Sequence, residues 1–283
     1  MAQVVAGIAC SHVPLMASQK NWERLPAPER EHLRSGFARA RQLLEAARAD
    51  VIVTFADDHF DRCFYDNLPA FLVGVGEEAV GPAVDGFDVP KVRLPIASDL
   101  ARFIVREGLE NGVDFSFSEE LALDHAEIAP MIHLTPRWDI PIIPIVVNAF
   151  APPMPTPKRC FDVGAFIGAC VERWPGNERV AFIGTGGISH WVGPPETGRI
   201  NQEFDRWFLE RMTRGEISDI TTRYERYEDL EAVAGNGGHE IRDWLCVAGA
   251  IGTRLRPQVL AYEPLKAWAA GVGIMAWSPP GWG

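Results

Sequence analysis

Two histidines and one glutamate, His12, His59 and Glu240, stand where predicted strands end or a helix begins. Imidazole nitrogens and carboxylate oxygens both bind metals, and two histidines with one carboxylate can occupy one face of an octahedral ion. The opposite face then stays open for a substrate and for dioxygen, as in non-haem Fe(II) oxygenases. The three residues therefore predict a mononuclear iron site.

Two further histidines, His125 and His190, are expected in similar loops at the ends of strands. The chain holds only seven histidines, so this many imidazoles at such positions favours one shared pocket over isolated loop residues. Two of the remaining three, His32 and His133, are interpreted as a solvated residue on a charged helix and a satisfied, half-buried residue.

The elements that must position these side chains follow one pattern. Short β-branched, apolar runs at residues 4–9, 51–56 and 179–183 read as buried strands. They lead to His12, to Asp57-Asp58-His59 and to the glycine-rich segment that ends at His190. In open α/β sheets, sites gather at the carboxyl ends of the strands, so these histidines are expected to meet.

Glu240 follows the glycine-rich segment 235–239 and is expected to open a helix. His239 is the rival ligand beside it. Adjacent residues on a helix point in different directions, so only one of the two is expected to reach the metal. We favour Glu240, because a carboxylate offsets part of the charge of an ion that must also bind dioxygen. Of Asp57 and Asp58, one is expected to cap its loop or to orient a histidine.

The pattern of the whole chain predicts an α/β fold: a single domain, residues 1–283, with a central mixed sheet flanked by helices and the active site at the strand ends. The proline-rich segment 151–157 cannot form regular structure, because proline lacks the N–H and fixes φ, so it is read as a loop. Further strands are expected at residues 71–76, 142–148 and 271–277. Helices are expected at residues 28–49, 99–108, 160–173, 201–212 and 239–250.

Composition narrows the class of protein. The net charge is -11 and no cluster of Lys and Arg is present, so neither nucleic acid nor an anionic membrane is an expected partner. The five cysteines are scattered and include no C-x-x-C pair, which indicates a reduced intracellular chain. No signal-peptide pattern and no apolar run of membrane-spanning length is found, and the cytoplasm is the expected location.

Taken together, the short motifs resemble the class III extradiol ring-cleaving dioxygenases. This family includes the protocatechuate 4,5-dioxygenase β subunit and the 2,3-dihydroxyphenylpropionate 1,2-dioxygenases. Each motif is weak alone, but their order and spacing over nearly the whole chain are specific. The motifs are Ser11-His12-Val13-Pro14, Asp58-His59, Asp124-His125, the segment 184–190 and His239-Glu240.

The resemblance implies roles for five residues. His12, His59 and Glu240 match the Fe(II) ligands of the family, His190 matches its acid/base histidine, and His125 a second pocket histidine. The implied reaction is cleavage of a catechol-type ring beside the diol with O2, giving a muconic semialdehyde type of product. A separate small α subunit or a homo-oligomer is the implied assembly.

The substituent on the ring is expected from the same resemblance to be a carboxylate, as in protocatechuate or gallate. An anionic group needs a cation or a cluster of N–H groups beside the ring. Arg159, Arg199 and Lys266 are candidates by their location in loops.

Two alternatives from other classes stay open at this point. The same three ligands could bind Zn²⁺ with an activated water and hydrolyse an amide or ester. The chain could also be the non-catalytic partner subunit of a two-component dioxygenase, although retention of all five residues speaks against that alternative.

Overall fold

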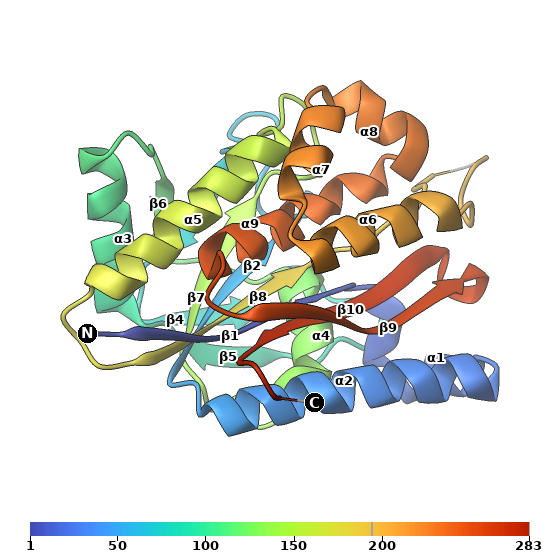
Figure 1. The fold of residues 1–283 in the computed structure, drawn as a ribbon, viewed down its shortest axis with the longest axis horizontal. Coiled ribbons are helices and arrows are strands. Elements are labelled where there is room, and N and C mark those ends of the chain that lie inside the picture. Colours follow the sequence, from blue (N-terminus) through green and yellow to red (C-terminus); the bar gives the residue numbers. More distant parts are fainter. Residues whose placement is uncertain (194, 283) are drawn as a thin grey trace.

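A mixed sheet of eight strands forms the centre of the computed structural model, which describes residues 1–193 and 195–282 (Figure 1). In spatial order the strands are β6 (Ser116–Ser118), β3 (Phe71–Gly74), β7 (Ile142–Val147), β2 (Val51–Ala56), β8 (Arg179–Thr185), β1 (Gln3–Cys10), β10 (Ala270–Ser278) and β9 (Arg256–Leu265).

The four central strands β7, β2, β8 and β1 run parallel to one another. β2 and β7 are buried along their whole length, since helices cover both faces of the sheet, and this burial explains their continuous apolar sequences. β3 and β10 pair antiparallel with β7 and β1, so the sheet is mixed, as expected from the sequence.

Helices cover the two faces as separate layers (Figure 1). On one face lie α2 (Ala27–Ala47), which packs on β1, β9 and β10, and α4 (His125–Leu134), which packs on α2 and β2. On the other face lie α9 (Ile241–Ile251), against β8 and β1, and α5 (Pro157–Arg173), which packs along α9. The remaining helices are α1 (Gln19–Glu23), α3 (Ser98–Glu110), α6 (Gln202–Arg214), α7 (Ile217–Arg223) and α8 (Tyr227–Ala234), with short 3-10 turns η1 (Pro14–Ala17), η2 (Gly237–Glu240) and η3 (Lys266–Trp268).

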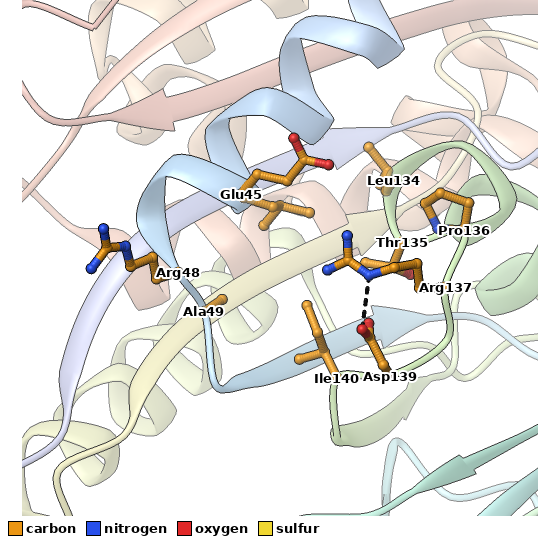
Figure 2. A pocket seen from close by; sticks show the side chains of 10 residues that line it. Glu45, Arg48, Ala49, Leu134, Thr135, Pro136, Arg137, Asp139 and Ile140 are labelled. Atoms are coloured by element: carbon orange, nitrogen blue, oxygen red, sulfur yellow. Dashed lines mark hydrogen bonds and ion pairs between the residues drawn. The ribbon is translucent and has the colours of Figure 1, made fainter.

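The parallel arrangement brings three sequence-distant loops to one edge of the sheet. β1 ends at Cys10, β2 at Ala56 and β8 at Thr185, and neighbouring strands end at the same level. The end of α2 leads into β2, and residues 134–140 lead into β7. Figure 2 shows a cavity between these two segments, beside the amino ends of the two strands. That cavity lies at the opposite edge, away from the histidine-bearing loops.

Several segments differ from the sequence-based expectation, and two of them concern His125 and the edge of the sheet. His125 does not follow a strand directly but is the first residue of α4, a helix that was not predicted. Strand β9 was also missed, because Pro257 and Pro264 argue against a central strand. β9 pairs only with β10 and forms an edge of the sheet, where prolines are tolerated.

A small hairpin of β4 (Glu78–Gly81) and β5 (Val92–Pro95) was not predicted either. It forms a second sheet of its own. No helix in the described part of the chain is long and apolar enough to cross a membrane.

Candidate metal centre

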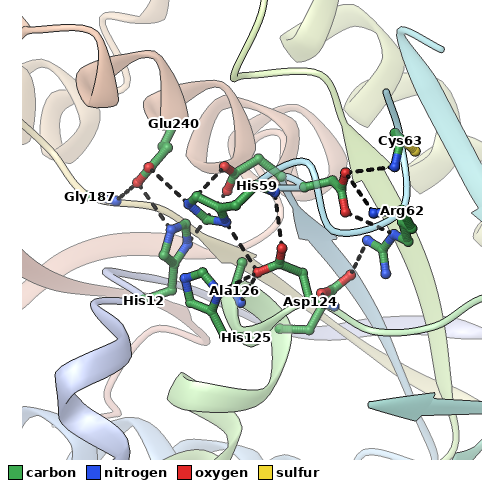
Figure 3. A network of polar contacts seen from close by, with 12 residues as sticks. His12, His59, Arg62, Cys63, Asp124, His125, Ala126, Gly187 and Glu240 are labelled. Carbon is green, nitrogen blue, oxygen red and sulfur yellow. Dashed lines mark hydrogen bonds and ion pairs between the residues drawn. The ribbon is translucent and has the colours of Figure 1, made fainter. Parts of the chain in front are cut away.

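His12, His59 and Glu240 meet at the carboxyl edge of the sheet (Figure 3). His12 comes two residues after β1 and His59 three residues after β2. Glu240 is the last residue of η2 and the N-cap of α9, and it reaches the same point from the opposite layer. The strand-end argument predicted the meeting of the histidines, and Glu240 was placed separately by its position at the start of a helix.

The spacing of their donor atoms suits a single ion. Nε2 of His12 lies 3.3 Å from Oε2 of Glu240, and Nε2 of His59 lies 3.8 Å from Oε1. One ligand atom each from these three residues and from Asp57 all lie within 4.8 Å of one another. Such a set could hold a metal ion, and its nitrogen and oxygen donors suit a divalent first-row metal.

Glu240 is held as an anion in a buried position. It is only 4% exposed, and its Oε2 accepts a hydrogen bond from the main-chain N–H of Gly187. Burial alone would raise the pKa of Glu240, but the imidazoles of His12 and His190 stabilise the charged form and hold the pKa well below its usual value. A carboxylate in that state is ready to bind a cation.

Asp124 fixes the orientation of His59 and His125. Its Oδ2 accepts from the main-chain N–H of His59 at 3.0 Å, and its Oδ1 lies 3.1 Å from Nδ1 of His59 and 2.8 Å from Nδ1 of His125. Burial would raise the pKa of Asp124, but these histidines lower it far below its usual range. The ionised carboxylate accepts, so Nδ1 of each ring carries the proton and Nε2 is the free donor atom.

The same aspartate also builds the start of α4. Asp124 accepts from the N–H of Ala126, and Glu127 accepts from the N–H of Asp124, which together form a capping box. The sequence showed Asp124 only as part of a motif, but the S/T/D-x-x-E spacing before an apolar run could have identified the cap.

Asp57 is the acidic residue of the site that the sequence left ambiguous. It is fully buried, and its oxygens lie 3.7 Å from Nδ1 of His12 and 3.5 Å from Nε2 of His59, without a hydrogen bond to either. Burial raises its pKa above the usual value. Asp58 has the capping role instead, since its Oδ2 accepts from the N–H of Cys63 at 2.9 Å and Oδ1 pairs with Arg62.

The histidine pKa values reflect the surrounding acids. Burial would lower the pKa of His12, but Glu240 and Asp57 raise it above the usual value. His59 behaves alike, with Asp57 and Asp124 raising its pKa well above the usual value. A cation bound between the rings would replace the protons that these carboxylates otherwise favour.

His190 lies beside the same carboxylate, with Nε2 3.3 Å from Oε1 of Glu240. Its main chain is fixed on both sides, since His190 N–H donates to Ala234 and its carbonyl accepts from Gly237. The preceding residue, Ser189, donates its N–H to the buried carboxylate of Asp205. The loop after β8 is therefore held in one position relative to Glu240.

His239 points away from this group. Its Nδ1 lies 2.8 Å from Nη1 of the buried Arg242, and its Nε2 lies 3.2 Å from Oε2 of Glu231. Burial and the guanidinium of Arg242 lower the pKa of His239 to about 3. Both ring nitrogens are therefore occupied, and of the adjacent pair only Glu240 faces the histidines.

The two remaining histidines lie apart from the site. Nε2 of His133 lies 3.2 Å from the carbonyl oxygen of Met16, and its ring packs against Trp22, as expected for a satisfied half-buried residue. His32 is half-exposed on α2, and its Nδ1 lies 2.6 Å from Glu263. The interpretation of His32 as merely solvated therefore missed a hydrogen bond across to β9.

Comparisons with known proteins agree with this arrangement. The family model described as the catalytic LigB subunit of aromatic ring-opening dioxygenase matches residues 6–273. Relatives from Photorhabdus laumondii and Rhodococcus rhodochrous are both named 2,3-dihydroxyphenylpropionate/2,3-dihydroxicinnamic acid 1,2-dioxygenase. They are 26% and 29% identical, over 96% and 94% of this chain and 96% of each relative.

A solved structure shares the fold. The crystal structure of the uncharacterized protein JW3007 from Escherichia coli K12 aligns with a TM-score of 0.57 over 96% of this chain and 99% of that chain. The sequence identity is 14%, so this likeness concerns the fold alone.

Proposed function

Because the chain belongs to the family of catalytic LigB subunits of aromatic ring-opening dioxygenases, we propose that it cleaves a catechol-type ring with O2 in an Fe(II)-dependent extradiol reaction. Membership in a catalytic family makes the chain an enzyme, so the alternative of a non-catalytic partner subunit is not retained. The observation that supports iron chemistry best is the convergence of two imidazoles and one carboxylate on one point.

We assign the metal to His12, His59 and Glu240. The Nε2 atoms of both histidines and the carboxylate of Glu240 would hold the ion, with Asp124 directing His59 through its Nδ1. When bound, Fe(II) supplies a Lewis acid for the catechol oxygens and the redox chemistry that O2 requires. The buried, unpaired oxygens of Asp57 add negative charge beside the same point and favour a cation there.

His190 is the proposed acid/base residue. An imidazole can accept a proton from a catechol hydroxyl and return it later near neutral pH. The side chain of His190 is 14% exposed, against 4% and 5% for His12 and Glu240, so it borders the open side of the site. Its fixed main chain keeps Nε2 beside the metal ligands, where a diol hydroxyl would lie.

His125 is proposed to hold the diol. Its ring stacks on His59, with centroids 4.3 Å apart, and Asp124 engages its Nδ1. The remaining nitrogen, Nε2, is then an acceptor for a hydroxyl proton of the substrate. The ring would open beside the diol, giving a muconic semialdehyde type of product.

Oxygen uptake by anaerobically Fe(II)-loaded protein tests this function, against catechol, substituted catechols, aminophenols and dihydroxypyridines. Uptake with a new ring-opened chromophore supports it. Full iron occupancy without uptake on any of these rings contradicts it. The zinc alternative makes the opposite prediction, namely hydrolysis of an ester or amide by Zn²⁺-loaded protein without O2.

The assembly and the ring substituent are separate parts of the proposal. Either a homo-oligomer or a complex with a small α subunit would complete the enzyme, and light scattering on the purified active protein distinguishes them. The carboxylated ring expected from the sequence stays a prediction. The charges of the residues around the open side of the site determine whether a carboxylate on the ring is favoured there.

A further inference from the structure

The open side of the site lies at His59, His125 and His190. Their side chains are 23%, 15% and 14% exposed, whereas those of His12 and Glu240 are almost completely buried. A substrate that reaches the metal ligands must therefore enter past these three rings. Any substituent that points away from the diol lies against whatever surrounds them.

Aromatic side chains border His59 and His125 on that side. Phe150, in the loop after β7, packs on the ring of His59 with centroids 5.6 Å apart. Phe60 packs on Phe150 at 4.8 Å. On the other flank, Phe87 lies 6.3 Å from His125. Phe150 is 36% exposed and Phe87 59% exposed, so both offer apolar surface to a bound molecule.

The charges of the same loops are predominantly negative. The loop at residues 57–67 contains four aspartates and one arginine, and the loop at residues 148–156, which carries Phe150, has no charged residue. The arginine, Arg62, is largely buried and pairs with both Asp58 and Glu127. Asp61 lies beside Asp124 and His125.

The cations suggested from the sequence do not compensate for these acids. The guanidinium of Arg199 lies 4.2 Å from the centroid of the Trp191 ring and pairs with Glu196 at 2.7 Å. Arg159 and Lys266 are exposed, and within residues 1–193 and 195–282 neither side chain makes a polar contact with the site. Lys91, near Phe87 in sequence, pairs with Asp85.

From this arrangement, and resting on the proposed function, we infer that the preferred ring carries a neutral, apolar substituent and not a carboxylate. The substituent packs on Phe150, which contacts His59 from the open side, and on Phe60, which packs on Phe150. A carboxylate at the same place meets the acidic loop at residues 57–67, whose one arginine is already paired. This preference differs from what the names of the relatives suggest, since those enzymes are named for a propionate and a cinnamic acid.

Matched pairs of rings test the inference. The carboxylates are 3,4-dihydroxybenzoate and 3-(2,3-dihydroxyphenyl)propionate, each compared with its carboxamide, with 4-methylcatechol and unsubstituted catechol as references. A single uncompensated charge about 12 Å away, at an effective dielectric constant of about 20, changes kcat/KM roughly tenfold. We expect each carboxamide to exceed its carboxylate by at least roughly this factor, and 4-methylcatechol to match or exceed the carboxamides.

Anaerobic titration of the iron-loaded protein with the same pairs gives the order of affinities without turnover.

Two variants of Phe150 test whether the substituent packs on this side chain. Phe150→Ala is expected to lower kcat/KM for 4-methylcatechol roughly tenfold while changing that for catechol much less. Phe150→Leu, which keeps apolar volume, is expected to retain most of the preference. Arg199→Gln is expected to leave the carboxylate-to-carboxamide ratio unchanged.

The outcomes separate the two proposals. Turnover of catechol with carboxylates as the best substrates, or a selective loss of carboxylate turnover in Arg199→Gln, overturns this inference and leaves the proposed function standing. An unchanged ratio of kcat/KM between 4-methylcatechol and catechol in Phe150→Ala also overturns it. Absence of oxygen uptake with every ring at full iron occupancy ends the proposed function and this inference together.

Discussion

The carboxylate of Asp124 contacts His59 twice, through the main-chain N–H at 3.0 Å and through ring Nδ1 at 3.1 Å. The two contacts fix both the position and the tautomer of a proposed metal ligand. Carboxylates that hold a ligating histidine in this way typically contribute 10- to 100-fold, roughly, to metal affinity. Asp124 also holds His125, so one side chain couples the proposed metal ligand to the proposed second pocket histidine.

Replacing this carboxylate tests that coupling. Asp124→Asn keeps a good N-cap for α4 but removes the charge that fixes Nδ1 of His59. We expect the Kd for Fe(II) to rise roughly 10- to 100-fold, measured by anaerobic titration. Asp139→Asn is the matched control, since Asp139 pairs with Arg137 on an exposed loop away from the site. Equal iron affinity in both variants would contradict the orienting role.

His190 is expected to affect turnover and not metal binding. His190→Gln removes the proton acceptor beside Glu240, while His12 and His59 remain in place. Loss of general acid–base catalysis typically lowers kcat roughly 10²- to 10⁴-fold, whereas iron content should equal that of the wild type. His32→Gln, on the exposed face of α2, serves as the control. Loss of iron from His190→Gln would refute this division of roles.

Gly237 tests how tightly His190 must be placed. A Cβ added at Gly237 would overlap the imidazole of His190, whereas one added at Gly86 meets open space. Gly237→Ala should therefore displace the ring and lower kcat roughly 100-fold with iron still bound. Gly86→Ala should behave as the wild type. Full activity in Gly237→Ala would mean that the position of this ring does not limit the reaction.

The sequence predicted the central part of the site because it depends on topology. Strands β1, β2 and β8 each read as an apolar run, and the ends of neighbouring parallel strands meet at one edge. The meeting of His12, His59 and His190 followed from that rule alone. The rotation between adjacent helical residues predicted that only one of His239 and Glu240 would face the histidines, and the choice of Glu240 rested on the charge of its carboxylate.

The contacts that tune the site could not be predicted in the same way. Asp124 acts on His59 across 65 residues, and no pattern of spacing encodes that distance. The apolar pattern of α4 is interrupted by Pro130, which hid the helix that carries His125. Prolines likewise hid β9, whose position at the edge of the sheet is a tertiary property.

Burial of Asp205 makes the free energy of unfolding depend on pH. Burial raises its pKa from the usual 3.8 to about 6, although Tyr262 and the N–H of Ser189 both donate to it. The folded protein therefore binds this proton more tightly than the unfolded chain. The resulting stability is fully present below about pH 4 and is lost as the pH rises through about 6.

The rise in the pKa of Asp205 corresponds to about 3 kcal/mol in the free energy of unfolding. Relative to Asp205→Asn, the wild type should lose approximately that amount between pH 4 and pH 7, measured by denaturant unfolding of the apoprotein. Asp219→Asn, at an exposed residue of α7, should show no such difference. A wild type and Asp205→Asn with parallel pH profiles would contradict the raised pKa.

The adjacent residues His239 and Glu240 should give opposite results on substitution. Glu240→Gln removes the carboxylate that faces His12 and His59, so iron should no longer bind stoichiometrically. His239→Gln breaks the contacts with Arg242 and Glu231, so it should lower the Tm of the apoprotein and leave the iron content unchanged.

Thermal unfolding with and without iron measures this difference. A ligand at 100 times its Kd stabilises the folded state by about 2.7 kcal/mol, which is several degrees in Tm. Iron should therefore raise the Tm of the wild type and of His239→Gln, and a chelator should reverse the rise. Glu240→Gln should show no rise, and a rise in that variant together with none in His239→Gln would exchange the roles of the two residues.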